Sequence, residues 1–136
     1  MSAHQPGIAL GLGCDRGTPA STIAQCIAEA LAEANATLAD VRAVASIDLK
    51  ADEIGLAEIA QTNGWSIRFY PAADLAAVAV PNPSETVRKY TGTPSVSEAA
   101  AILVAGADQS HLIIEKHKLR GPDGRNATVS IARIPL

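Results

Sequence analysis

A glycine-rich loop between an apolar run and an amphipathic segment is the feature that most constrains this chain. The segment reads Gly11-Leu12-Gly13-Cys14-Asp15-Arg16-Gly17, and Thr18-Pro19 follows it. Glycine lets the backbone approach other atoms closely, and a loop that leads into a helix aims free N–H groups at whatever lies there. The pattern therefore predicts a buried strand, a tight loop and a helix. The ligand that such a loop suits best is an anion.

Hydrophobic periodicity predicts further elements on both sides of this loop. The first strand is expected at 7–13, with Thr18 as the N-cap of the next helix and Pro19 in its first turn. Apolar residues then recur at helical spacing, which predicts one buried face: Ile23, Ile27, Ala30, Leu31 and Ala34. The other expected elements are a strand at 41–47, a helix after 48–53 that ends at Asn63-Gly64, an edge strand at 65–70, a helix from 95 onward and strands at 111–118 and 127–134.

Four prolines leave residues 71–94 harder to interpret, and short helices are expected near 74–78 and 84–90. Ser95 and Glu98 fit a capping box for the helix that follows. Taken together, the pattern predicts an α/β fold, a three-layer αβα sandwich with a mixed, mostly parallel sheet of about five strands.

The length and composition favour a single domain over residues 1–136 and exclude several classes of function. Aromatic residues make up only 3% of the chain, too few for the stacking that binds single-stranded nucleic acid. No apolar run reaches the roughly 18 residues that a membrane helix needs, and no signal peptide is evident, so a cytoplasmic protein is expected. Cys14 and Cys26 are interpreted as thiols, with Cys26 in the core.

Charge is unevenly distributed along the chain. Residues 1–110 hold six Lys and Arg against twelve Asp and Glu, whereas residues 111–136 hold five against two. The basic end can receive an acidic small molecule or partner, although charges beside a hairpin turn are more often merely solvated.

Three loops are expected to meet at one rim, because the carboxyl ends of parallel strands gather at the same edge of such a sheet. They are 11–18, 48–53 and 91–98. The candidate ligand-binding residues on them are Gly13, Cys14, Asp15, Arg16, Gly17, Thr18, Lys50, Glu53, Ser95, Ser97 and Glu98. Arg16 suits a bidentate contact with a carboxylate, and Lys50 adds a point charge.

Several more specific sites are less well supported. Arg16 stands where a dinucleotide fingerprint needs its third glycine, and no Gly-Lys-Ser/Thr follows for a P-loop. Cys14 near a helix start is a conceivable nucleophile, but no histidine is tied to it. His111 and His117 lie about 20 Å apart on a presumed strand, so they cannot chelate one metal ion, and we expect no metal site. No cofactor is expected either. Three interpretations of Glu53 are open: a catalytic acid or base, a partner of Lys50, or a first-turn residue that interacts favourably with the helix dipole.

Beyond these local features, the chain resembles the CobE and CbiG C-terminal family of cobalamin biosynthesis proteins. The resemblance rests on the blocks at 11–17, 46–56, 93–101 and 127–132, and it covers residues 7–134. A stand-alone domain of this kind is more similar to CobE than to CbiG, which has a further N-terminal part. The resemblance implies an anionic tetrapyrrole as ligand, since precorrins carry many carboxylates.

Three functions remain open on these grounds. The first is an accessory or carrier protein of the aerobic corrin pathway that binds a precorrin or hydrogenobyrinic acid. The second is a precorrin-modifying hydrolase or carbon–carbon lyase with Glu53 or Glu98 as acid or base, since the CbiG family opens the lactone of a cobalt-containing precorrin. The third is a protein that docks onto another enzyme of the pathway through its basic hairpin.

Overall fold

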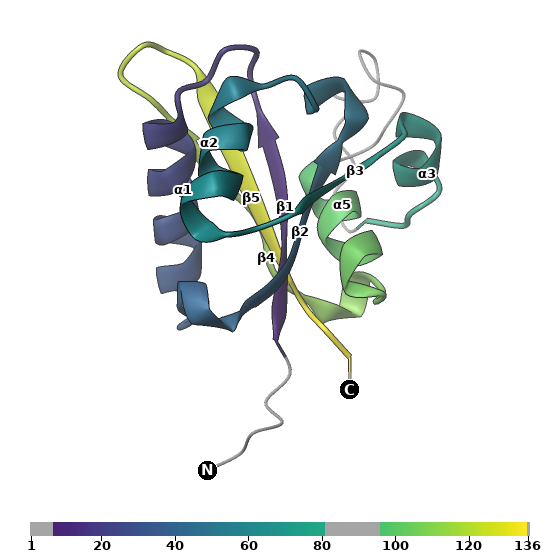
Figure 1. The fold of residues 1–136 in the computed structure, drawn as a ribbon. Coiled ribbons are helices and arrows are strands. Elements are labelled where there is room, and N and C mark those ends of the chain that lie inside the picture. The colour runs from purple at the N-terminus through teal and green to yellow at the C-terminus, as the bar shows by residue number, and fades with distance from the viewer. Residues whose placement is uncertain (1–6, 81–95, 136) are drawn as a thin grey trace.

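The described part of the chain forms a five-stranded mixed sheet in the order β3-β2-β1-β5-β4 (Figure 1). The computed structural model describes residues 7–80 and 96–135. The strands are β1 (Ile8–Cys14), β2 (Val41–Ile47), β3 (Ile67–Tyr70), β4 (Leu112–Arg120) and β5 (Asn126–Arg133). β1 is parallel to β2 and β2 to β3, whereas β5 is antiparallel to both β1 and β4. The predicted mixed, mostly parallel sheet is confirmed, and β3 is an edge strand as expected.

Helices cover both faces of this sheet, which gives the expected three-layer αβα sandwich. α1 (Ala20–Glu33) and α2 (Ile54–Asn63) lie on one face, and α3 (Ala72–Ala76) and α5 (Val96–Ala105) on the other (Figure 1). Short 3₁₀ turns, η1 (Leu38–Asp40), η2 (Asp48–Lys50) and η3 (Gln109–His111), precede β2, follow β2 and precede β4. Gly64 ends α2 in the left-handed conformation, as the Asn63-Gly64 pair predicts.

The face covered by α1 is packed with large aliphatic side chains. Leu10 and Leu12 of β1 are fully buried, and they share a core cluster with Ile23 and Ile27 of α1 and Ile131 of β5. The apolar stripe predicted for α1 is therefore the face that contacts the sheet. Cys26 also lies in this core, where burial raises the pKa of its thiol to about 12.

The face covered by α5 is built instead from small residues, so that helix and sheet approach closely. A Cβ atom at Gly11 would lie 1.8 Å from the carbonyl oxygen of Ser97 and 2.7 Å from the nitrogen of Ala101. Only glycine fits at this position. The first glycine of the loop motif thus serves helix packing, whereas the sequence favoured contact with a ligand.

Several expected boundaries differ from the structure. β1 continues through Cys14, so that residue ends a strand rather than starting a helix. Pro19 is the N-cap of α1, and the predicted cap by Thr18 is wrong because its hydroxyl donates to the carbonyl of Asp15 at 2.8 Å. His111 belongs to η3 rather than to the strand. The helix near 74–78 is α3, whereas that near 84–90 lies outside the described residues.

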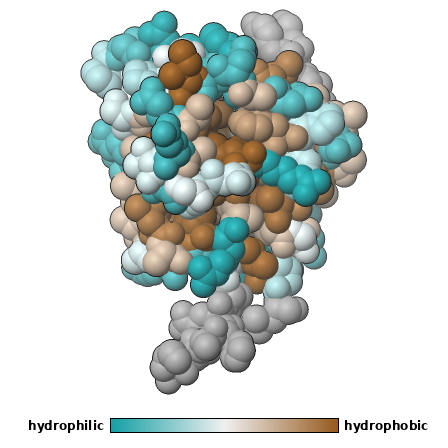
Figure 2. Space-filling model, viewed as in Figure 1, coloured by the Kyte–Doolittle hydropathy of each residue, from teal (hydrophilic) through white to brown (hydrophobic). Residues whose placement is uncertain are grey.

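The described residues include few exposed large hydrophobic side chains. On the face of Figure 2, brown hydrophobic residues stand among hydrophilic ones. Leu49 and Ile54, which flank the connection between β2 and α2, are 53% and 75% exposed. None of the helices in residues 7–80 and 96–135 has both the length and the apolar character needed to cross a membrane.

Candidate functional site

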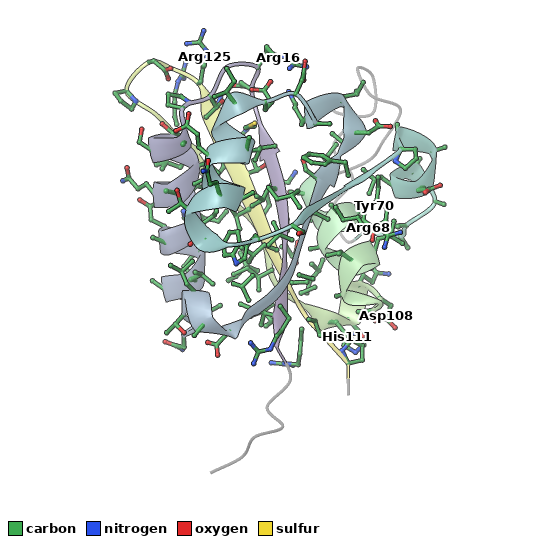
Figure 3. The ribbon with its side chains drawn as sticks, in the orientation of Figure 1. Arg16, Arg68, Tyr70, Asp108, His111 and Arg125 are labelled. Atoms are coloured by element: carbon green, nitrogen blue, oxygen red, sulfur yellow. The ribbon has the colours of Figure 1, made fainter. Side chains whose placement is uncertain are left out.

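The carboxyl ends of β1 and β2 bring two of the three predicted loops together at one end of the molecule. The loop after β1 carries Arg16 and approaches the β4–β5 hairpin, which carries Arg125, at the upper end of Figure 3. The Nε of Arg125 donates to the carbonyl of Arg16 at 3.0 Å. We call this end of the sheet the rim.

The glycine-rich loop already holds an anion, and that anion belongs to the chain itself. Glu53, the N-cap residue of α2, reaches across to the loop, and its Oε1 accepts from the Gly17 N–H at 3.0 Å. Its other oxygen lies 2.8 Å from Arg16 Nη1. Glu53 therefore neither pairs with Lys50 nor sits in the first helical turn, which were two of the three interpretations from sequence.

Other groups of this loop also find partners within the chain. The N–H groups of Asp15 and Thr18 donate to the carbonyls of Asn126 and Asp15, respectively. The carboxylate of Asp15 accepts from both the backbone and the side-chain nitrogen of Asn126, at 2.7 and 3.0 Å. The expectation that free N–H groups of this loop await a ligand is thus wrong for Asp15, Gly17 and Thr18, because Asn126 of β5, Glu53 at the start of α2 and Asp15 of the loop itself accept from them, respectively.

Arg16 is held by three acceptors of the segment between β2 and α2. Its Nη1 lies 2.7 Å from Asp52 Oδ1 in addition to Glu53, and its Nη2 donates to the carbonyl of Leu49 at 2.9 Å. The hydrogen bond from Arg16 lowers the pKa of the Asp52 carboxyl. Arg16 therefore joins the first loop to the second, although 61% of its side chain is still exposed.

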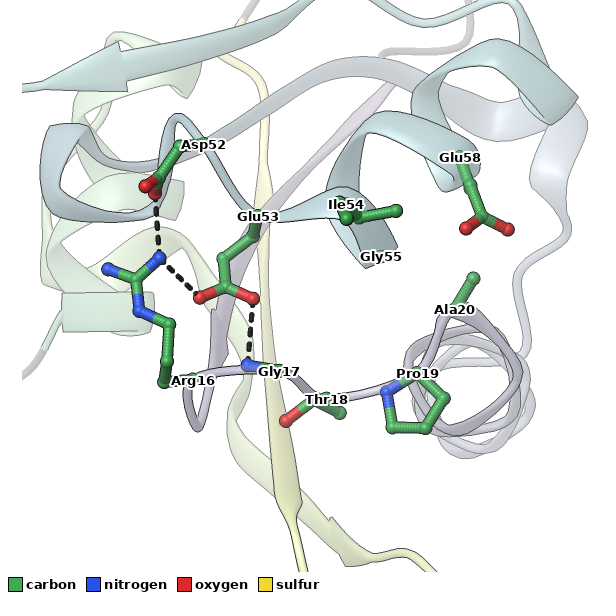
Figure 4. A pocket seen from close by; sticks show the side chains of 10 residues that line it. All are labelled: Arg16, Gly17, Thr18, Pro19, Ala20, Asp52, Glu53, Ile54, Gly55 and Glu58. Carbon is green, nitrogen blue, oxygen red and sulfur yellow. Dashed lines mark hydrogen bonds and ion pairs between the residues drawn. The ribbon is translucent and has the colours of Figure 1, made fainter.

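A pocket of about 400 Å³ opens beside this network, between the starts of α1 and α2 (Figure 4). Segments 16–20 and 52–55 line it together with Glu58. Three of its side chains are carboxylates, those of Asp52, Glu53 and Glu58, and Arg16 is the cation among the lining residues. The charge of this pocket is unfavourable for a ligand that carries further carboxylates.

Cys14 and Lys50 lie near each other where β1 and β2 end. Burial raises the pKa of the Cys14 thiol to about 11, and the positive charge of Lys50 opposes that rise without cancelling it. The prediction of a thiolate favoured by a helix start is therefore wrong, because the residue is a half-buried strand end. Lys50 itself is half-buried and makes no ion pair within the described residues.

The first turn of α5 contributes Ser97 and Glu98, which are 3% and 1% exposed. The hydroxyl of Ser130 on β5 donates to that of Ser97 at 2.8 Å. Glu98 Oε1 faces Lys116 of β4, 3.7 Å from its Nζ. Both residues thus lie between α5 and the sheet, at the edge of the rim, and Ser95 lies outside the described residues.

Polar residues on β4 and β5 lie on the α5 side of the sheet next to the rim, and the loop motifs did not indicate them. Thr128 and Ser130 face α5, because Ala127 and Val129, which alternate with them, belong to the core on the α1 side. Lys116 approaches Glu98 on the same face. Alternation along the last two predicted strands was the signal that could have placed these residues.

The side chains of His111 and His117 each contact carboxylates of this chain, and the two residues lie in different parts of the fold. His117 lies between Glu29 and Glu33 of α1, with its Nε2 and Nδ1 at 2.8 and 2.9 Å from their oxygens. His111 pairs with Asp108 at 3.0 Å, at the far end of the molecule from the rim (Figure 3). Within residues 7–80 and 96–135 no group of three His, Cys, Asp or Glu side chains is arranged to hold a metal ion.

Known proteins with related sequences belong to cobalamin biosynthesis. The model of the family described as cobalamin synthesis G C-terminus matches residues 8–132. The chain is 41% identical over 128 residues to a cobalt-precorrin-5A hydrolase of Priestia megaterium, covering 94% of this chain but 32% of that protein. It is 43% identical over 112 residues to Protein CobE of a Sinorhizobium species, covering 81% of this chain and 72% of that protein.

A solved structure agrees with these relatives. The crystal structure of CobE, a protein of the cobalamin (vitamin B12) biosynthetic pathway, superposes with a TM-score of 0.73 at 29% sequence identity. The match covers 98% of this chain and 96% of that one. The chain thus spans nearly all of a CobE structure and about a third of the hydrolase.

Proposed function

The chain belongs to the cobalamin synthesis G C-terminus family of cobalamin biosynthesis proteins, and from this premise we propose that it binds a precorrin or hydrogenobyrinic acid as an accessory or carrier protein. The observation that carries the proposal is the environment of the Lys50 side chain. This cation is half-buried at the rim beside Cys14, and within the described residues it forms no ion pair, although its charge does act on the nearby carboxyl of Asp52. A corrin precursor bears acetate and propionate groups that can fill that role.

The other residues of the site divide into two roles in this proposal. Gly13, Cys14 and Lys50 border the ligand, together with the buried edge formed by Ser97 and Glu98. Arg16 and Glu53 act as positioning residues, because their contacts with each other and with Gly17 fix the loop against α2. A loop fixed in advance reduces the entropy lost on binding.

Titration with hydrogenobyrinic acid tests the proposal. Binding should quench the fluorescence of Trp65, the single tryptophan, or shift the absorbance of the pigment. The variant Lys50→Gln should bind more weakly, whereas Arg133→Gln, which removes an exposed cation from the opposite end of β5, should bind as the wild type does. No response of the wild-type protein would rule out this function.

An enzyme that hydrolyses a precorrin or cleaves one of its carbon–carbon bonds is a second candidate, and Glu98 favours it. This carboxyl group is buried at the edge of the rim with Lys116 nearby, where it can exchange a proton with a bound pigment. Incubation with pathway intermediates followed by mass analysis separates the two functions. A product that disappears in Glu98→Gln supports catalysis, and recovery of unchanged pigment supports a carrier.

A partner that docks onto another enzyme of the pathway is the third function, and it concerns the basic hairpin. Arg125 is exposed there, although it also contacts Asp123 and the loop at Arg16. Such docking would appear as co-elution with the enzyme that weakens as salt is added.

A further inference from the structure

We propose that three basic residues on one face of β4 form a second carboxylate-binding subsite of the rim, on the α5 side of the sheet. They are Lys116, Lys118 and Arg120, and we call them the β4 basic row. This inference rests on the proposed binding of a polycarboxylate pigment, and it specifies where the carboxylates that do not reach Lys50 are bound.

The strand register places the row on the α5 side. Lys118 is paired with Thr128 and Arg120 with Asn126. Thr128 points away from the core cluster on the α1 side, since its neighbours Ala127 and Val129 are members of that cluster. Directly paired residues share a face of the sheet, so Lys118 and Arg120 also face the α5 side.

Contacts within the chain leave two of the three cations available. Lys116 faces Glu98, whereas Lys118 and Arg120 are exposed and make no ion pair or side-chain hydrogen bond in the described ranges. They stand two residues apart on the same face, so their charges repel each other. Binding of an anion between them removes that repulsion, which favours a ligand with carboxylates at fixed positions on a rigid ring.

A line of paired residues joins the β4 basic row to the end of β1. Gly13 of β1 is paired with Thr128, and Thr128 with Lys118, so these three residues form a line across three strands. The line spans two strand spacings, about 10 Å. One row further from the rim, Ser130 is fully buried beneath Ser97 of α5, whereas Thr128 is half-buried. Exposure on this face therefore increases toward the rim, and the described residues that form the line are a glycine, a half-buried threonine and an exposed lysine.

Charge also distinguishes this side of the rim from the other. The pocket between α1 and α2 is lined by three carboxylates, and its cation, Arg16, is paired with two of them. Among the described residues, the α5 side offers the β4 basic row, with the carboxylate of Glu98 facing Lys116. A polycarboxylate that contacts Lys50 is consequently attracted across Gly13 toward Lys118 and repelled from the pocket.

The test uses the double variant Lys118→Gln/Arg120→Gln of the full chain. Both side chains are exposed, so the fold should be retained, which circular dichroism and urea unfolding will check. We expect the Kd for hydrogenobyrinic acid to rise about tenfold or more and its salt dependence to become shallower. Arg133→Gln is the matched control, because it removes an exposed strand cation at the opposite end of β5, and its Kd should stay within about twofold of wild type.

The outcomes separate this inference from the function on which it rests. If the wild type binds the pigment and the double variant binds it equally well, the subsite is wrong and the proposed function stands. If the wild type does not bind, both fail. An equal loss of affinity in Arg133→Gln would reveal an effect of net charge and would also overturn the subsite. The subsite would likewise be wrong if the double variant bound the pigment as the wild type does but no longer co-eluted with an acidic protein.

Discussion

The Nη1 atom of Arg16 lies 2.8 Å from Oε2 of Glu53, a residue 37 positions later in the chain, and this contact joins the first loop of the rim to the start of α2. The same carboxylate accepts from the N–H of Gly17. Glu53 is 4% exposed, so both interactions are shielded from water on its side. The loop that suggests a ligand site is therefore held by an internal acid.

Replacement of Glu53 by Gln should destabilise the protein by about 1–3 kcal/mol, because a buried charged acceptor loses its match with Arg16. Urea unfolding measures the change. Asp52→Asn provides the matched control, since Asp52 contacts the same guanidinium from an exposed position and should matter much less. Equal effects of the two variants would contradict the assignment of Glu53 as the principal anchor.

Arg16 and Lys50 should respond differently to the same loss of charge. Arg16→Gln should lower the free energy of unfolding, because its three acceptors lose their donor. Lys50→Gln should leave unfolding nearly unchanged and weaken pigment binding, since within the described residues it has no ion-pair partner to lose. Paired urea and fluorescence titrations check both variants. A stable Arg16→Gln that fails to bind would instead assign Arg16 to direct ligand contact.

The sequence predicted those features that follow from local periodicity. Ile23 and Ile27 repeat at helical spacing because one face of α1 is buried, and the alternation in β3 reflects a half-buried edge strand. Such patterns are imposed by burial on neighbouring residues, so they can be read without knowledge of the fold. The layers and the sheet type follow from the order of these elements.

The partners of the loop residues could not be predicted in the same way. Glu53 and Gly17 are far apart in sequence, and no spacing rule connects a helix N-cap to a loop that follows a different strand. For Gly11 the sequence showed a need for a small residue without showing whether a ligand or α5 required it. Thr18 is a favoured cap residue, yet its hydroxyl finds carbonyls of Asp15 and Asn126 instead.

The substitution Gly11→Ala should destabilise the protein by about 1–3 kcal/mol or more, because the added methyl group meets the backbone of α5. A backbone atom cannot turn aside as a flexible side chain can. Gly64→Ala is an instructive comparison: its Cβ meets nothing within 4 Å, but its φ of 68° is unfavourable for alanine, which predicts a loss of about 1 kcal/mol. Urea unfolding that ranks Gly64→Ala as the costlier change would contradict close packing at Gly11.

Cys14 should react slowly with iodoacetamide at neutral pH. Its pKa of about 11 leaves little thiolate, so the rate of alkylation should keep increasing well above pH 9. The variant Cys14→Ser retains Cys26, whose pKa of about 12 and full burial predict even slower labelling, and it gives the background rate. Rapid labelling of Cys14 at pH 7, measured by mass spectrometry, would contradict this prediction and would support Cys14 as a nucleophile.

The contact between α1 and β4 should make stability depend on pH in the acid range. The hydrogen bond to His117 lowers the pKa of Glu29, with a smaller contribution from Gln25. A carboxyl group with a lowered pKa in the folded state stabilises the protein above the pKa it has when unfolded, and the contribution is lost as the pH falls through the folded value. The free energy of unfolding should therefore decrease below about pH 4.5 in the wild type and decrease less steeply in Glu29→Gln. Glu58→Gln, an acid of α2 without this contact, should retain the wild-type slope, and identical slopes for all three proteins would show that Glu29 does not contribute.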